Sequence, residues 1–313
     1  MRIGFNTKYD WILADLERLS SEITLTQLKI SSGKNFLYPS DNPSEIRLSI
    51  HYKQSIARVE RYQRTIDEGI AFLKAQESAL AQVEDLIARA KVLAIQSVND
   101  INDKNIREAI AKEIGSIIET ILSLANSQLG EKYIFAGQKT TGYTPGEKPF
   151  KLIKESLPDG QIIEKVIYNG SIKDLTLEYD KNMKIKLGRN GQVIFMDSGI
   201  FETLIGLKRT LEANNIEDFR KEQYDIQKFI AKLDDIYNYI ASIRGETGTK
   251  IRHLEVKKNL YEKFKDTLKT NLGNIEGADL TKLATDLQRL ITAYDAALRA
   301  TVIVSDLSLA KYL

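Results

Sequence analysis

"SSGKNFLYPSDNPSEIR", residues 31–47, interrupts a chain that is otherwise patterned for long helices. The stretch is polar, and it holds one glycine and two of the five prolines in the 313 residues. Gly33 is suited to end a helix, because glycine adopts the left-handed conformation without steric cost. Asn42, Pro43 and Glu45 are suited to start the next one, as N-cap, first helical residue and capping-box partner. The stretch therefore predicts either a plain helical hairpin or a joint between parts with different roles.

Both ends of the chain carry a narrow apolar stripe with the alternating four-and-three spacing of a coiled coil. We call these two stripes the seams. The N-terminal seam is Phe5, Tyr9, Ile12, Leu16, Leu19, Ile23, Thr26 and Ile30, and the C-terminal seam is Leu280, Leu283, Leu287, Leu290, Tyr294, Ala297, Thr301 and Val304. Each stripe needs a partner helix to cover it. Periodicity does not decide whether that partner lies in the same chain or in another copy.

The inner segments predict much longer helices. Residues 44 to 129 contain no proline and only two glycines, and residues 159 to 313 contain no proline at all. Apolar periodicity predicts helices from 44 to about 100, over 106–124, and from about 214 to 271. "GETG" at 245–248 resembles a turn, but the pattern resumes beyond it, so we expect the last of these helices to continue through it.

The middle of the chain differs from its flanks. Five runs between about 150 and 196 read as strands: "FKLIKES", "QIIEKVIYNG", "IKDLTLEYD", "MKIKLG" and "QVIFMD". Turn pairs such as Asn169-Gly170 separate them. A short helix, "SGIFETLIGLKRTLEAN", then leads back to the helical pattern. This region predicts a small antiparallel β domain inserted between two helical halves.

The predicted fold class is mainly α with a small β insertion. We expect an elongated rod of long antiparallel coiled-coil helices, formed by the N- and C-terminal halves, plus the inserted antiparallel β domain. The predicted division is an N-terminal assembly helix and hinge (1–40), N-terminal rod helices (41–140), the β domain (141–200), C-terminal rod helices (201–272), and a C-terminal hinge and assembly helix (273–313).

Composition excludes several classes of function. The formal net charge of +2 gives no broad attraction to nucleic acid or anionic membrane. There is no cysteine, and the only histidines are His51 and His253, outside any HExxH pattern. No apolar run is long enough for a secretory signal or a membrane span. We therefore predict no enzyme activity and no catalytic, cofactor-binding or metal-ligating residues.

Several longer segments resemble the flagellin superfamily, and within it the hook–filament junction proteins. They are "LKISSGKNFLYPSDNPSEIRLS" at 28–49, "LIARAKVLAIQSVND" at 86–100, "LANSQLGEKYIFAGQKT" at 124–140, "IRGETGTKIRHLE" at 243–255 and "YDAALRATVIVSDLSLAKYL" at 294–313. Two residues depart from the family pattern. Asn42 stands where an Asp is common, and Gly277 replaces an expected acidic residue, which predicts a more flexible second hinge.

The resemblance implies a structural role in the extracellular part of the bacterial flagellum. Members of the family are exported through the flagellar type III channel without a cleavable signal peptide, and their termini pack as a coiled-coil tube. The implied partners are the first hook-associated protein, flagellin, copies of the same chain in a ring, and an export chaperone before secretion. Neither nucleic acid nor membrane insertion is implied. Two alternatives stay open: a filament flagellin, and a secreted tip protein whose β domain recognises a ligand.

The resemblance and the seams together predict two sets of functional residues. The predicted assembly interface is Ile12, Leu16, Leu19, Ile23, Leu283, Leu287, Leu290, Tyr294, Leu298, Leu307 and Leu309. The predicted hinge and inter-subunit loop is Gly33, Ser40, Asp41, Asn42, Pro43, Glu45 and Gly277. Ser40 and Asp41 are expected to bond to an adjacent subunit.

Overall fold

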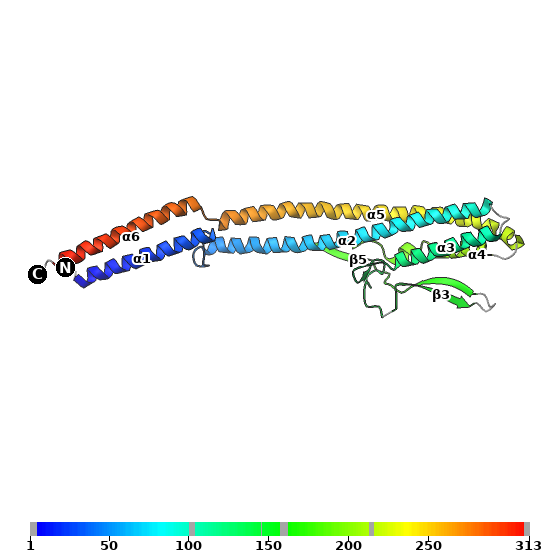
Figure 1. The fold of residues 1–313 in the computed structure, drawn as a ribbon, viewed down its shortest axis with the longest axis horizontal. Coiled ribbons are helices and arrows are strands. Elements are labelled where there is room, and N and C mark those ends of the chain that lie inside the picture. The colour runs from blue at the N-terminus through cyan, green and yellow to red at the C-terminus, as the bar shows by residue number, and fades with distance from the viewer. Residues whose placement is uncertain (1–4, 100–103, 145, 157–161, 213–215, 310–313) are drawn as a thin grey trace. The chain divides into compact units, whose positions relative to one another are not determined.

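A computed structural model describes all of the chain except residues 1–4, 100–103, 145, 157–161, 213–215 and 310–313 (Figure 1). The fold is mainly helical, as predicted. The α-helices are α1 (Phe5–Ser32), α2 (Pro43–Asn99), α3 (Lys104–Ala125), α4 (Ile200–Leu211), α5 (Ile216–Glu276) and α6 (Leu280–Leu309). The residues divide into two compact units, which we describe separately: 1–60 with 263–313, and 61–262.

The first unit contains α1 and α6, which lie side by side and antiparallel (Figure 1). The start of α1 and the end of α6 are at the same end of this pair. The first turns of α2 and the last turns of α5 belong to the same unit. Within this unit, one short joint follows α1 and another precedes α6.

The second unit has a core shared by α2, α3, α4 and α5. The most buried side chains include Ile66, Leu73, Leu80, Ile87, Ile114, Ile121, Phe135 and Phe195. Ion pairs join α2 to α5 in antiparallel register: Asp67 with Lys258 at 2.7 Å, Glu84 with Arg244 at 2.7 Å, and Asp234 with Lys91 at 2.5 Å. As the residue number on α2 rises, that of its partner on α5 falls. This register brings the two halves of the chain together, as predicted.

Helix α5 continues through "GETG" without a break, which confirms the prediction for this segment. Glycine costs an exposed helix about 1 kcal/mol relative to alanine. The neighbouring residues offset that cost. Arg244 bonds to Glu77 and Glu84, and Thr247 is buried with its hydroxyl donated to the Ile243 carbonyl at 2.9 Å. Tertiary contacts therefore override the local turn signal.

The β insertion forms three separate two-stranded antiparallel sheets instead of one. The pairs are β1 (Gln128–Leu129) with β2 (Lys132–Tyr133), β3 (Phe150–Ser156) with β4 (Ile162–Tyr168), and β5 (Leu175–Asp180) with β6 (Met183–Leu187). The β5–β6 hairpin packs closely on α2, because a Cβ added at Gly69 would lie 2.6 Å from the Leu177 side chain.

The prediction of a last strand at "QVIFMD" is wrong. Residues Gln192–Met196 form one turn of π-helix, η1. The Asn190 side chain starts it by accepting a hydrogen bond from the Val193 backbone at 3.2 Å. Ile194 and Phe195 are consecutive and both buried. A strand would send them to opposite faces, so only a helical turn buries both in the same core.

Candidate functional site

The two seams meet each other in the first unit. In α1, Leu19 is buried at 6% exposure, and Ile12, Leu16 and Ile23 are half-buried. In α6, the corresponding half-buried residues are Leu283, Leu287, Leu290 and Tyr294. Most of the residues between these positions are exposed. Helices α1 and α6 therefore cover each other's seams, so each seam has a partner helix in the same chain.

Helix α6 carries a second apolar stripe that α1 does not cover. Leu298, predicted for the assembly interface, is 40% exposed and lies off the seam. It belongs with other exposed residues at four- and seven-residue spacing, of which Val302 is the most exposed at 60%. The open flank of α6 is Ala284, Ile291, Leu298 and Val302, together with Leu280, the first residue of the seam, which is 52% exposed. Leu307 and Leu309 lie in the part of α6 for which only the backbone is described.

Helix α1 also leaves apolar side chains open. Leu13, Leu25 and Leu28 are exposed. Leu13 and Leu28 line a groove of about 700 Å³ together with Tyr38 from the joint and Tyr294 from α6. We call this surface, with the open flank of α6, the open face of the terminal helices. Sequence reasoning missed most of it, although the three- and four-residue spacing was available as a signal.

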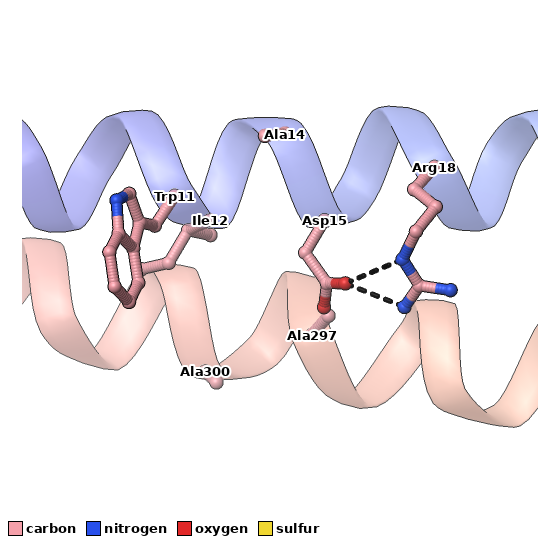
Figure 2. Close-up of a pocket in the computed structure, with 7 residues that line it drawn as sticks. All are labelled: Trp11, Ile12, Ala14, Asp15, Arg18, Ala297 and Ala300. Carbon is pink, nitrogen blue, oxygen red and sulfur yellow. Dashed lines mark hydrogen bonds and ion pairs between the residues drawn. The ribbon is translucent and has the colours of Figure 1, made fainter.

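A second groove of about 670 Å³ lies between the two helices near the start of α1 (Figure 2). Its lining includes Trp11, the only tryptophan in the chain, and Ala297 and Ala300 from α6. The Trp11 ring extends from α1 toward α6 and remains 72% exposed. On the same side, Asp15 accepts a hydrogen bond from Arg18 at 2.7 Å.

The two joints are hydrogen-bonded to each other. Lys34 and Gly277 form an antiparallel bridge. The Asn35 backbone N–H donates to the Glu276 carbonyl at 2.8 Å, and the Ala278 N–H donates to the Gly33 carbonyl at 3.0 Å. The sequence predicted two joints at equivalent places in the two halves. The structure adds that they pair directly.

The predicted hinge residues take local roles in this joint. Gly33 follows the end of α1 with a φ of 66°. Asn42 precedes α2, and its side-chain oxygen accepts a bond from the Glu45 backbone N–H at 3.3 Å. Pro43 is the first residue of α2. The capping box is only half formed, because Oε2 of Glu45 is buried without a hydrogen-bond partner among the described residues.

The loop ahead of α2 uses Asp41 internally. One carboxylate oxygen of Asp41 accepts backbone bonds from Leu37 at 2.9 Å and from Tyr38 at 3.1 Å. These bonds from Tyr38 and Leu37 lower the pKa of Asp41 below its usual value. Ser40 is exposed. Within this unit Asp41 therefore shapes the loop, and its contact with an adjacent subunit stays a prediction.

Gly277 has a steric reason to be glycine. A Cβ at this position would lie 2.5 Å from the carbonyl oxygen of Gly273, closer than real Cβ atoms approach. A side chain is therefore disfavoured at this position, and the flexibility expected of the second hinge stays a prediction. Sequence reasoning also missed two neighbours. Asp279 caps α6 by accepting the Lys282 N–H at 3.0 Å, and Glu276 holds the joint together.

The described residues offer no other kind of site. No group of three or more His, Cys, Asp or Glu residues among them is arranged to hold a metal ion. His253 instead packs its ring edge-on against Tyr179, with centroids 5.7 Å apart. None of the described helices combines the length and apolar character needed to cross a membrane.

Comparison with known proteins defines the class first. Residues 5–140 match the family described as the bacterial flagellin N-terminal helical region. The chain is therefore similar, over this N-terminal part, to the flagellin class of proteins.

Within that class the chain is similar to flagellar hook-associated protein 3. It is 25% identical to that protein from Salmonella typhimurium over an alignment of 280 residues that covers 83% of each chain. Its fold resembles the flagellar junction protein FlgL from Legionella pneumophila, with a TM-score of 0.58 at 14% identity over 73% of this chain and 99% of the other. It is also 27% identical to flagellin from Aquifex aeolicus, but over only 40% of this chain and 24% of that flagellin.

Proposed function

We propose that this chain is a structural component of the bacterial flagellum and forms the junction between the hook and the flagellin filament. The observation that carries the proposal is the extent of the similarity. The Salmonella hook-associated protein 3 matches along 83% of both chains, including the β insertion. The Aquifex flagellin matches over 124 residues only. A filament flagellin is therefore the weaker alternative.

The proposed mode of assembly uses the terminal helices. The seam pairs α1 with α6, and the open face remains for neighbouring copies. Fully burying a leucine contributes about 1.5–3 kcal/mol. Covering what is still exposed of Leu298 would thus contribute about 1 kcal/mol per contact. Such a contact is weak for one pair of subunits, but it is repeated around a ring.

The finer parts of the proposal concern partners and location. We infer that the chain contacts the first hook-associated protein on one side, flagellin on the other, and its own copies in a ring. Before secretion an export chaperone binds it, and it leaves the cell through the flagellar export channel. The assembly parts are residues 1–40 and 273–313, the rod parts 41–140 and 201–272, and the β domain 141–200. The role is structural and not enzymatic.

One experiment tests the junction role directly. In a strain that lacks this chain, we expect hooks without filaments and flagellin released into the medium. Expressing the chain should restore filaments, and electron microscopy should place it in a short boundary zone. Normal filaments in the deletion strain would refute the proposal. Long filaments made by the purified chain alone would identify a flagellin. No incorporation into flagella would favour a secreted tip protein.

A further inference from the structure

Glu276, the last residue of α5, contacts two other segments of the first unit, α2 and the joint after α1. Its carboxylate oxygen Oε1 accepts a hydrogen bond from the Ser49 hydroxyl at 2.5 Å and forms an ion pair with Lys53, both on α2. Its backbone carbonyl accepts the N–H of Asn35, in the joint after α1. One residue therefore holds the end of α5, the second and third turns of α2, and the first joint.

The surroundings of the Glu276 carboxylate favour its charged form. The side chain is 16% exposed. That partial burial by itself raises the pKa of the carboxyl, but the bonds from Lys53 and Ser49 and the charges of Lys53 and Lys34 outweigh it, so the pKa lies below its usual value. Charge-assisted bonds of this kind are stronger than neutral ones. The contact is well suited to keep the joint closed.

Because Glu276 directly precedes the second joint, its contact with α2 concerns both joints. Glu276 is followed directly by Gly277, which bridges to Lys34, and by Ala278, which donates to the Gly33 carbonyl. If Glu276 leaves α2, the segment Gly277–Ala278 loses the contact that ties it to α2. Asn35 bonds to Glu276 itself, and Ala278 lies two residues beyond it, so both cross-joint bonds lie close to this contact.

We propose that Glu276 is a latch that couples the two joints, so that the joint after α1 and the joint before α6 open together or remain closed together. The terminal helices then keep one orientation relative to the adjoining turns of α2 and α5. This inference concerns the isolated chain and does not depend on the proposed place in the flagellum. For assembly it means that every copy presents its open face at the same angle.

The test is backbone hydrogen exchange on the full chain carrying Glu276→Gln. Asn35 and Ala278 report the opening of the joints, because their N–H groups bond across them. Ile46 and Leu283 are internal controls, because they bond to Asn42 and Asp279 within the caps of α2 and α6. We expect exchange at Asn35 and Ala278 to rise together by about ten-fold, the change expected for losing charge-assisted bonds. Ile46 and Leu283 should stay unchanged.

The matched control is Glu22→Gln, which removes the same charge from an exposed ion pair with Arg18 on α1. It should leave all four amides unchanged. A rise at only one of Asn35 and Ala278 would show that the joints open independently and would overturn the proposal. No rise at either would also overturn it. An equal rise at all four would show that Glu276 merely stabilises the unit, which contradicts a latch.

Discussion

Effects on folding and on assembly can be separated by placing a lysine at one of two positions on α6, in two separate variants. Leu290 lies in the seam, half-buried against α1, whereas Leu298 lies on the open flank at 40% exposure. Leu290→Lys removes about half of the 1.5–3 kcal/mol that a fully buried leucine contributes, and it places an ammonium beside an apolar stripe. Because the long lysine stem reaches toward water, we expect a loss of about 2 kcal/mol in the pairing of α1 with α6. Leu298→Lys should cost the isolated chain less than about 0.5 kcal/mol.

Trp11 makes this difference measurable in the relevant unit. It is the only tryptophan, it lies on α1, and it shares a groove with Ala297 and Ala300 of α6. Its fluorescence during urea unfolding therefore reports the terminal pair, while circular dichroism at 222 nm reports all helices. Leu290→Lys should lower the fluorescence midpoint and leave most of the dichroism transition in place. Leu298→Lys should leave both unchanged.

Assembly should show the opposite sensitivity. A lysine at position 298 puts an unpaired charge on the face that neighbouring copies are proposed to cover, and this costs several kcal/mol if it is fully desolvated. Cells with only Leu298→Lys should carry hooks with few filaments. Thr292→Lys, at another exposed position of α6, is the matched control. Normal filaments with Leu298→Lys, or equal unfolding by both leucine variants, would refute the division between seam and open face.

Three further changes test the joints. Asn42→Ala should destabilise the start of α2 by about 1 kcal/mol, measured by thermal melting. Glu45→Ala should have little effect on the melting temperature, because its carboxylate does not complete the capping box. Equal losses of stability in the two variants would contradict this. Gly277→Ala should destabilise the first unit by about 1–3 kcal/mol, since its methyl group would meet the Gly273 carbonyl, and an unchanged Trp11 unfolding midpoint would show that the joint yields easily. Because the pKa of Glu276 is lowered in the folded chain, its stabilisation is present above its unfolded pKa of about 4.3 and disappears as the pH falls through the folded value. The stability difference between the wild type and Glu276→Gln should therefore close below about pH 4, and a constant difference would count against it.

Features with a local cause could be predicted from the sequence. The end of α1 at Ser32 follows from Gly33, and the start of α2 at Pro43 follows from Asn42 and proline geometry. The register of the seams was also readable, because apolar spacing alone selects the buried face. These signals act over one or two helical turns. They fix helix bounds and faces, but not what each face meets.

Features with a long-range cause could not be predicted in the same way. The contact between Ser49 and Glu276 joins residues 227 positions apart, and no spacing rule connects them. The π-helical turn at 192–196 resembles a strand locally, and only the shared core around Ile194 and Phe195 requires otherwise. The open flank of α6 is different, since its spacing was visible. It was missed because one stripe had already been assigned as the seam.

The positions of the two apolar stripes on α6 indicate where a neighbouring helix would bind. Leu287 and Tyr294 belong to the seam, and they also lie in line with Ala284, Ile291 and Leu298 at three- and four-residue intervals. At 100° per residue, this places the second stripe beside the seam and not opposite to it. To bury two apolar stripes that lie next to each other, a helix needs two neighbouring helices that also lie next to each other. Since α1 is one of these neighbours, the second must lie against both α6 and the open side of α1, where Tyr294 and Leu13 line the same groove. In the proposed ring, a helix from another copy placed there would cover the open flank of α6 and the open side of α1 together.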